Sequence, residues 1–267
     1  MKRTLWILSL LLLLTGSPLV AATFEGRDFD FHGFKGVEFK HAGRTAKVVL
    51  PETKISGMPW IWRARFFGHE PQTDIELLKK GWHVAFIDVA GLYGGSEAIA
   101  IWDSFFKLLT EEHGFSNRPA LEGMSRGGLI IFNWAAANPD KVSSIYADAP
   151  VCDIRSWPGG KGKAKGSPRN WTECLRAHGL TEESSSSAMT SPIHVADRIA
   201  QAGIPVLCVV GDADDVVPVL ENTAIMEKII RKQGGSIQVL HKPGVGHHPH
   251  SLNPPDTIVG FILANAK

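Results

Sequence analysis

Hydrophobic and polar residues alternate through the region that follows the apolar N-terminus. Between residues 23 and 51, large apolar side chains such as Phe29 and Phe31 are separated by polar ones. This period of two places one face of a strand on the core, and the pairs 32–33 and 42–43, each ending in glycine, are typical of tight turns. The region is therefore predicted to form antiparallel strands.

Further along the chain, short apolar runs alternate with longer stretches of helical period. Further strands are predicted at residues 59–67, 83–88, 142–147, 205–210 and 237–241. Helices are predicted at residues 72–80, 96–113, 129–137, 219–232 and 255–264, with Ser96 as the cap of the second. Continuous apolar strands suit a sheet that is covered on both faces. Strands that alternate with helices indicate a parallel sheet with crossover helices, so an α/β fold of one domain is expected.

The alternation breaks between residues 152 and about 200, where glycine, lysine and serine are frequent. This stretch is predicted to be a cap-like insertion over one edge of the sheet. It contains Trp157 and Trp171, which are our candidate substrate-binding residues. The two indoles either form a platform for sugar rings or anchor a loop that is otherwise rich in glycine.

The N-terminus has the pattern of a secretory signal. Two basic residues precede an apolar run at residues 5–14, and small residues follow at positions 20–22. We expect residues 1–22 to be removed, leaving 23–267 as the folded domain, secreted or periplasmic and without stable membrane association. An uncleaved anchor is the alternative, although the apolar run is short for a membrane span.

Composition restricts the possible protein classes and partners only slightly. The chain has 267 residues, of which 44% are hydrophobic and 21% charged, so one large core is expected. Its net charge of +1 argues against nucleic acid as a partner. Of the three cysteines, Cys208 lies within a predicted core strand. In an exported protein, Cys152 and Cys174 could form a disulfide across the insertion.

One glycine-rich segment has the pattern of a nucleophile elbow. Residues 123–127 read Gly-Met-Ser-Arg-Gly and lie between a short apolar run and the predicted helix 129–137. A sharp turn from strand to helix leaves almost no room for side chains beside the serine, a demand that glycine meets. Ser125 would then stand at a helix N-terminus, where free N–H groups favour negative charge.

A serine nucleophile needs a base, and the base needs a group that orients it. Segments 211–218 and 244–250 offer both, because each follows a predicted strand and the first is rich in aspartate and the second in histidine. The carboxyl ends of parallel strands meet at one edge of the sheet, where these side chains can converge. The candidate partners of Ser125 are Asp212, Asp214 and Asp215, and His247, His248 and His250.

Together these segments resemble the α/β-hydrolase superfamily from about residue 23 to residue 267, and in detail secreted bacterial esterases and prolyl-oligopeptidase-type hydrolases. The order serine, aspartate, histidine along the chain is the order of that superfamily. The resemblance selects Asp214 and His247 and implies that they form a catalytic triad with Ser125. It also implies an oxyanion hole, for which the amides of Arg126 and His69 are the candidates.

The Arg126 side chain is open to several interpretations. A Ser-Arg pair at the elbow resembles glucuronoyl esterases, in which the guanidinium assists the oxyanion or contacts an acidic sugar; the alternative is a salt bridge behind the helix. Arg63 and Arg65 are expected to pair with carboxylates such as Glu122 and Asp88. No cofactor is expected, and no metal site either, because the histidines at 247–250 lack a cysteine or carboxylate at ligand spacing.

The sequence thus predicts an exported serine hydrolase that cleaves carboxylic esters through an acyl-enzyme. An acylated or esterified carbohydrate is the preferred substrate class, so a small-molecule or glycan ester is the expected partner. One alternative is a prolyl-oligopeptidase-like peptidase, against which we weigh the lack of a large additional domain in this chain. The other is a hydrolase fold that binds without catalysis.

Overall fold

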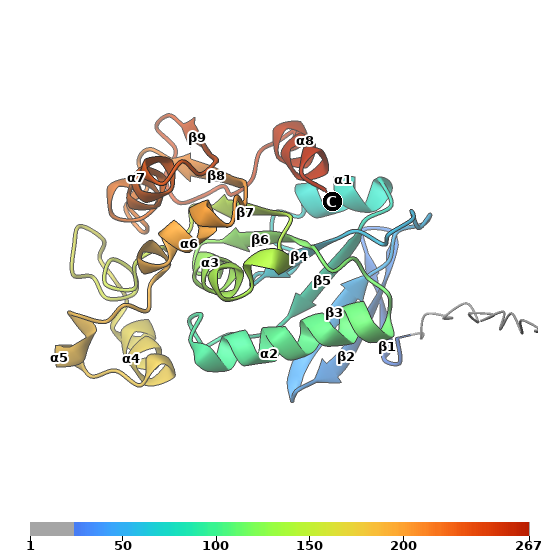
Figure 1. The fold of residues 1–267 in the computed structure, drawn as a ribbon, viewed down its shortest axis with the longest axis horizontal. Helices are drawn as coiled ribbons and strands as arrows, with labels where there is room; N and C mark the ends of the chain where they lie inside the picture. The colour runs from blue at the N-terminus through green and yellow to red at the C-terminus, as the bar shows by residue number, and fades with distance from the viewer. Residues whose placement is uncertain (1–23, 267) are drawn as a thin grey trace, which may run out of the picture.

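A nine-stranded sheet organises the computed structural model, which describes residues 24–266 (Figure 1). The strands are β1 (Arg27–Phe31), β2 (Phe34–His41), β3 (Arg44–Val49), β4 (Trp60–Ala64), β5 (His83–Ile87), β6 (Ala120–Met124), β7 (Ser144–Asp148), β8 (Val206–Gly211) and β9 (Ile237–Lys242). The helices are α1 (Gln72–Lys79), α2 (Ser96–Lys107), α3 (Gly127–Ala137), α4 (Pro168–His178), α5 (Glu182–Ser185), α6 (Ala196–Gln201), α7 (Thr223–Lys232) and α8 (Asp256–Ala264). The predicted signal at residues 1–22 lies outside the described residues.

The strand order is β1-β2-β3-β5-β4-β6-β7-β8-β9. Strands β1, β2, β3 and β5 pair in antiparallel fashion, and every pair from β5 to β9 is parallel. The predicted fold class, a mostly parallel sheet with helices on both faces, is therefore confirmed. Consecutive parallel strands bring the loops at their carboxyl ends to one edge of the sheet.

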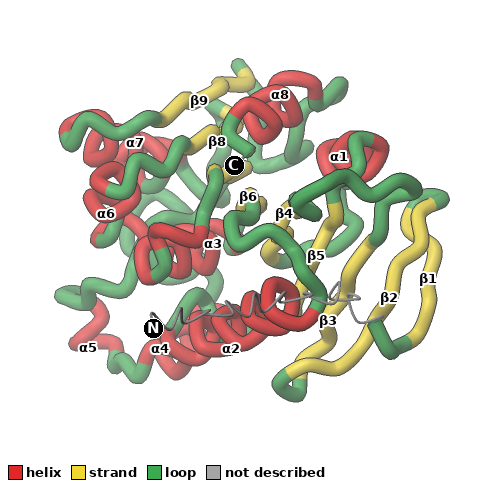
Figure 2. The backbone as a smooth tube through the Cα atoms, turned by 45° about the vertical axis from the view of Figure 1, so that its right-hand side comes forward, coloured by secondary structure: helices red, strands yellow, loops and turns green. Residues whose placement is uncertain are grey.

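Successive residues of the central strands pack into two separate hydrophobic cores, one on each face of the sheet. Trp60 and Trp62 of β4 pack on the face that α2, α3, α6 and α7 cover, whereas Ile61 packs on the face covered by α1 and α8. Figures 1 and 2 show these two helical layers on opposite sides of the sheet. The Trp62 and Trp102 rings stack at 3.9 Å between β4 and α2, which fixes that layer against the sheet.

Several predicted boundaries shift. Strand β4 ends at Ala64 rather than at residue 67, because Arg65 and Phe66 have φ angles of 66° and 46° and leave the extended conformation. Gly95, not Ser96, occupies the N-cap of α2, and no side chain caps that helix. Helix α2 ends at Lys107, followed by a short π-helical turn.

Helices α4 and α5 extend from one end of the sheet (Figure 1), and α4 packs in a third apolar core that it shares with Leu129 of α3. Trp157, Trp171 and Cys174 belong to that core, whereas Cys152 belongs to the core between the sheet and α2 and α3. All three cysteines are described, and all are free, so the suggested disulfide between Cys152 and Cys174 is absent. No described helix is long and apolar enough to cross a membrane.

Because of His83, at the start of β5, we expect the free energy of unfolding to depend on pH. The ring is fully buried beside Phe115, and burial lowers its pKa to about 4. A histidine with a lowered pKa in the folded state binds a proton more readily when unfolded, so acid favours unfolding. Between about pH 7 and 4.5, His83 should cost the protein on the order of 2 kcal/mol of unfolding free energy.

Urea denaturation of wild type and His83→Gln at both pH values measures this contribution. We expect the loss of stability on acidification to be smaller in the variant, since glutamine does not titrate. Equal losses in the two proteins would refute the assignment.

Candidate active site

Ser125 occupies the turn between β6 and α3 with a φ of 50°, in the left-handed region. Two backbone hydrogen bonds hold this turn: the Ser125 amide donates to Asp148 O at 2.8 Å, and the Ser125 carbonyl accepts from the Val151 amide at 2.9 Å. The nucleophile elbow expected from the sequence is thus present. Its backbone is fixed by β7 and by the segment after it.

The surrounding glycines are required by backbone contacts. A Cβ atom on Gly123 would lie 2.8 Å from the Gly127 carbonyl oxygen, and one on Gly127 would lie 2.6 Å from the Ala64 oxygen. A Cβ atom on Gly128 would approach Val151 O to 2.8 Å. Strand β4, the elbow and the segment after β7 are therefore in direct backbone contact.

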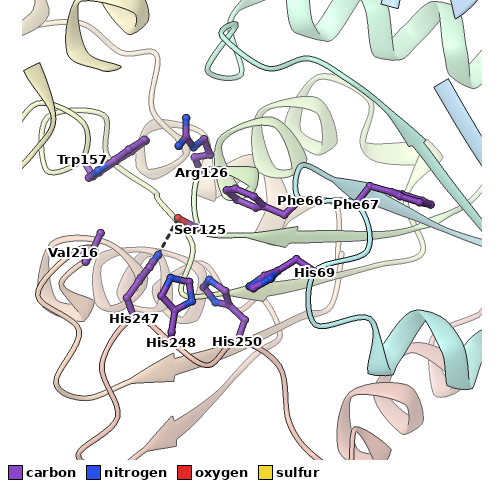
Figure 3. Close-up of a pocket in the computed structure, with 10 residues that line it drawn as sticks. All are labelled: Phe66, Phe67, His69, Ser125, Arg126, Trp157, Val216, His247, His248 and His250. Atoms are coloured by element: carbon purple, nitrogen blue, oxygen red, sulfur yellow. Dashed lines mark hydrogen bonds between the residues drawn. The ribbon is translucent and has the colours of Figure 1, made fainter. Parts of the chain in front are cut away.

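A continuous chain of hydrogen bonds links the three side chains selected from the sequence. Figure 3 shows the part of it that joins His247 to Ser125. His247 Nε2 lies 3.0 Å from Ser125 Oγ, and His247 Nδ1 lies 2.7 Å from Asp214 Oδ2. Because a carboxylate can only accept, Nδ1 carries the proton in the neutral ring, and Nε2 is free to accept the proton of Ser125. This arrangement can activate a serine hydroxyl.

Asp214 is the best held of the three candidate carboxylates. Its Oδ1 atom accepts the amides of Val216 and Val217 at 2.9 and 2.8 Å, and its side chain is 1% exposed. By contrast, Asp212 pairs with His241 at the surface, and Asp215 is exposed. Only Asp214 is thus oriented toward His247.

The cavity in front of Ser125 has a volume of about 440 Å³. Phe66, Trp157 and Val216 give it apolar walls, and Arg126 lines it as well (Figure 3). A pocket with apolar walls and a few polar groups is typical of a small-molecule site. Trp157 therefore lies where a substrate would bind.

Trp171, the other tryptophan selected from the sequence, does not line this cavity. Its ring is buried in the core of the insertion, its indole N–H donates to Glu182 and Lys161 lies over its face. The prediction of a substrate-binding role for Trp171 is therefore wrong. Of the two interpretations of the sequence, a sugar platform or an anchor of the insertion, the anchor is the one that fits Trp171.

The Arg126 guanidinium lies over the rings of Trp157 and Phe66, at 5.1 and 5.8 Å from their centroids. It also donates to Asn170 Oδ1 at 3.1 Å, an atom that accepts the Tyr93 hydroxyl as well. No described carboxylate forms a salt bridge with it, so the salt bridge behind the helix is excluded. Burial and the nearby Glu173 raise the pKa of Tyr93 to about 12, so its hydroxyl remains a donor.

The two amides proposed for an oxyanion hole differ in the structure. The Arg126 amide, at the N-terminus of α3, makes no backbone hydrogen bond within the described chain. The His69 amide donates to Phe66 O at 3.0 Å, so the prediction that it is the second donor is wrong. The left-handed turn at residues 65–66 closes that bond and leaves the Phe66 amide without a partner among the described residues.

A buried arginine holds the loop that carries Phe66. The Arg63 guanidinium donates to the carbonyl oxygens of Phe66 and His69, and it pairs with Asp74 and Glu122. Burial raises the pKa of Glu122 well above its usual value, so this acid tends to remain protonated. The sequence suggested Glu122 and Asp88 as carboxylate partners for Arg63 and Arg65, and the structure pairs Arg63 with Glu122 and Arg65 with Asp88. The contact of Arg63 with the loop was not expected.

A second aspartate–histidine pair lies beside the first and was missed in the sequence. His250 was interpreted as a rim residue, yet it is 3% exposed, and its Nδ1 lies 2.8 Å from Asp148 Oδ1. The one available signal was the position of Asp148 at the carboxyl end of a predicted strand. His69 and His248 are the exposed neighbours of His250, and partial burial and the nearby imidazoles lower the pKa of His248.

Comparisons with known proteins agree with this geometry. The sequence model of the prolyl oligopeptidase family matches residues 75–259, well over half of the chain. No curated protein matches.

Among solved structures, a puromycin-hydrolysing peptidase from Mycobacterium tuberculosis superposes with a TM-score of 0.63 at 16% identity, covering 82% of this chain and 36% of that one. Porphyromonas gingivalis dipeptidyl peptidase 4 gives 0.67 at 18%, covering 87% and 35%. Pyrococcus horikoshii acylaminoacyl peptidase gives 0.67 at 16%, covering 92% and 42%. At these identities the likeness shows the α/β-hydrolase fold alone, and the chain spans less than half the length of each neighbour.

The elbow generates a prediction with a matched control. Gly127→Ala should lower the unfolding free energy by roughly 1–3 kcal/mol, because the new Cβ meets the backbone of β4 rather than a flexible side chain. Gly260→Ala in α8 adds the same group where nothing lies within 4 Å, so it should be neutral or stabilising by up to about 1 kcal/mol. Urea denaturation of both variants measures the difference. Similar stabilities would show that the elbow has room for a side chain.

Proposed function

We propose that this chain, which belongs to the prolyl oligopeptidase family, is a serine peptidase that cleaves small peptides through an acyl-enzyme. The observation that carries the proposal is the hydrogen-bonded chain from Ser125 through His247 to Asp214 in a hydrolase of this family. Family membership favours the peptidase, which the sequence offered as the alternative, over the carbohydrate esterase. Both reactions would use the same acyl-enzyme.

The reaction would proceed in two halves. Ser125 Oγ attacks the scissile carbonyl carbon while His247 Nε2 takes its proton, and His247 then returns that proton to the leaving amine. Water repeats the sequence and releases the acyl group from Ser125. Asp214 holds the ring in the tautomer that has Nε2 free, and it stabilises the imidazolium that forms in each half.

Negative charge that develops on the carbonyl oxygen would be stabilised by backbone donors. We assign this role to the amides of Arg126 and Phe66, both free of other backbone partners in the described chain and both on residues that line the cavity. Loss of one such donor typically raises the barrier by about 3 kcal/mol. The Arg63 contacts with Phe66 O and His69 O support the position of the second donor.

The cavity favours an acyl group with an apolar side chain. Phe66, Trp157 and Val216 would cover that side chain, and the Arg126 guanidinium would donate to a carbonyl or carboxylate oxygen further along the substrate. The same groups fit an apolar acyl ester. Ester cleavage therefore remains the second candidate activity, supported by the shared walls of the cavity.

We also propose export. The support is the basic, apolar and small-residue pattern at residues 1–22. A mature protein whose N-terminal residue, read by sequencing, is Thr23 would agree with the proposal, and a mature protein that keeps Met1 would refute it.

The proposed chemistry is tested with a fluorophosphonate probe and a substrate panel. Ser125→Ala should abolish labelling without altering the fold, and Asp214→Asn should lower kcat by about 10⁴-fold because it permits the wrong imidazole tautomer. Asp215→Asn is the matched control, since that carboxylate is exposed and apart from the triad; its kcat should equal that of wild type.

Peptidyl nitroanilides, nitrophenyl esters, acetylated sugars and sugar uronate esters then separate the substrate classes. We expect turnover of short peptidyl nitroanilides together with the activated nitrophenyl esters. Turnover of sugar esters without any amide cleavage would overturn the peptidase assignment while keeping the triad. A folded protein that takes up no probe would overturn both.

A further inference from the structure

Three imidazoles meet at the edge of the cavity without a role in the proposed reaction. His69 comes from the loop after β4, and His248 and His250 come from the loop after β9 (Figure 3). One ring nitrogen from each residue lies within 4.8 Å of those of the other two. Segments that are far apart in the sequence thus bring three nitrogen ligands to one point.

His250 is held as a metal ligand would be. Its Nδ1–H donates to Asp148 at 2.8 Å, which leaves the Nε2 lone pair free in the neutral ring. Asp148 is fixed in turn by the Tyr146 hydroxyl at 2.9 Å and the Ser251 amide at 2.8 Å. A buried carboxylate behind an imidazole is the common way in which proteins orient histidine toward zinc.

The other two rings are free to close on an ion. His69 and His248 are exposed, and neither ring has a hydrogen bond to any described residue. Zn–N bonds of about 2.0–2.1 Å place nitrogens about 3.4 Å apart in a tetrahedral site. Nitrogens that are at most 4.8 Å apart must therefore close by up to about 1.4 Å, which the two exposed rings can supply while His250 stays fixed.

We propose that His69, His248 and His250 form a binding site for a divalent transition metal ion, best fitted by Zn²⁺. Three imidazole ligands with no carboxylate among them suit zinc, whereas Ca²⁺ and Mg²⁺ require oxygen ligands. The fourth coordination position would be taken by water on the cavity side. The sequence predicted no metal site because the ligand that completes this one, His69, lies in a different loop.

The ion would inhibit the neighbouring serine. Ser125 and the three histidines line the same cavity, and the His247 ring centroid lies 5.0 Å from those of His248 and His250, so a bound ion and its water would occupy space in front of Ser125. Both His247 nitrogens are already bonded to Asp214 and Ser125, so this ring is not a metal ligand. The inhibitory effect rests on the proposed function, whereas metal binding does not.

Binding is tested on the full chain by competition for Zn²⁺ with a chromophoric chelator and by the visible spectrum of Co²⁺. We expect one equivalent of tetrahedral metal in wild type and in Ser125→Ala. His248→Gln and His69→Gln should each weaken binding by at least 10-fold. Asp148→Asn should weaken it by about 10- to 100-fold, the usual effect of losing the outer partner of a ligand.

His241→Gln is the matched control, because that exposed histidine also pairs with an aspartate but lies outside the cluster. It should bind Zn²⁺ as wild type does. Thermal melting of each variant verifies folding, and His69 and His248 are exposed enough for substitution without loss of the core. Millimolar binding in wild type, or equal affinity in His248→Gln and wild type, would overturn the site.

Inhibition is measured separately by the rate at which the fluorophosphonate probe labels Ser125. Zn²⁺ should slow labelling at least 10-fold in wild type, excess chelator should reverse this, and His248→Gln should need at least 10-fold more metal. Tight metal binding without any change in the labelling rate would keep the site and refute its inhibitory role. A protein that never takes up the probe would refute the hydrolase, while the cobalt spectrum still reports the site.

Discussion

The left-handed conformation of Ser125 is the constraint on which the rest of the structure depends. Ser125 has a φ of 50° between a strand and a helix, and this conformation requires nearby residues without side chains. Backbone atoms of other segments fill the space that side chains at the neighbouring glycines would need. The carbonyl of Ala64 from β4 occupies the volume beside Gly127, and Val151 occupies the volume beside Gly128. The order of β4, β6 and β7 in the sheet and the exposure of the serine hydroxyl are thus consequences of the same contacts.

Two aspartate–histidine pairs lie at this edge of the sheet, and the second nitrogen of each histidine faces a different neighbour. Asp214 and His247 lie on the loops after β8 and β9, and the free nitrogen of that ring reaches Ser125. Asp148 and His250 join the end of β7 to the loop after β9, and the free nitrogen of that ring belongs to the cluster with His69 and His248. Because Ser251 also donates to Asp148, the second pair holds in place the loop that carries His247.

Local patterns in the sequence predicted most of the fold and the core of the site. Alternating and continuous apolar runs gave the strand types, and glycines around Ser125 together with the chain order of Asp214 and His247 indicated where the three would meet. The errors fall where tertiary contacts decide. The His69 amide is bonded to Phe66 O in a left-handed turn whose carbonyls Arg63 holds, and His250 pairs with Asp148 across 102 residues. Trp171 is directed by Glu182 of the insertion rather than by its own neighbours.

The loop after β4 depends on one buried cation. Arg63 is 1% exposed, and leaving its charge there uncompensated would be costly, so Asp74 and the Phe66 and His69 carbonyls surround it. A buried ion pair seldom adds stability over an apolar replacement, but it fixes geometry, because each partner must stay in place to satisfy the charge. The loop at residues 65–69 carries both Phe66, which lines the cavity, and His69, whose ring centroid lies 5.9 Å from that of His250. The proposed oxyanion stabilisation and the proposed metal binding would therefore both depend on the position of this one loop, which the Arg63 contacts fix.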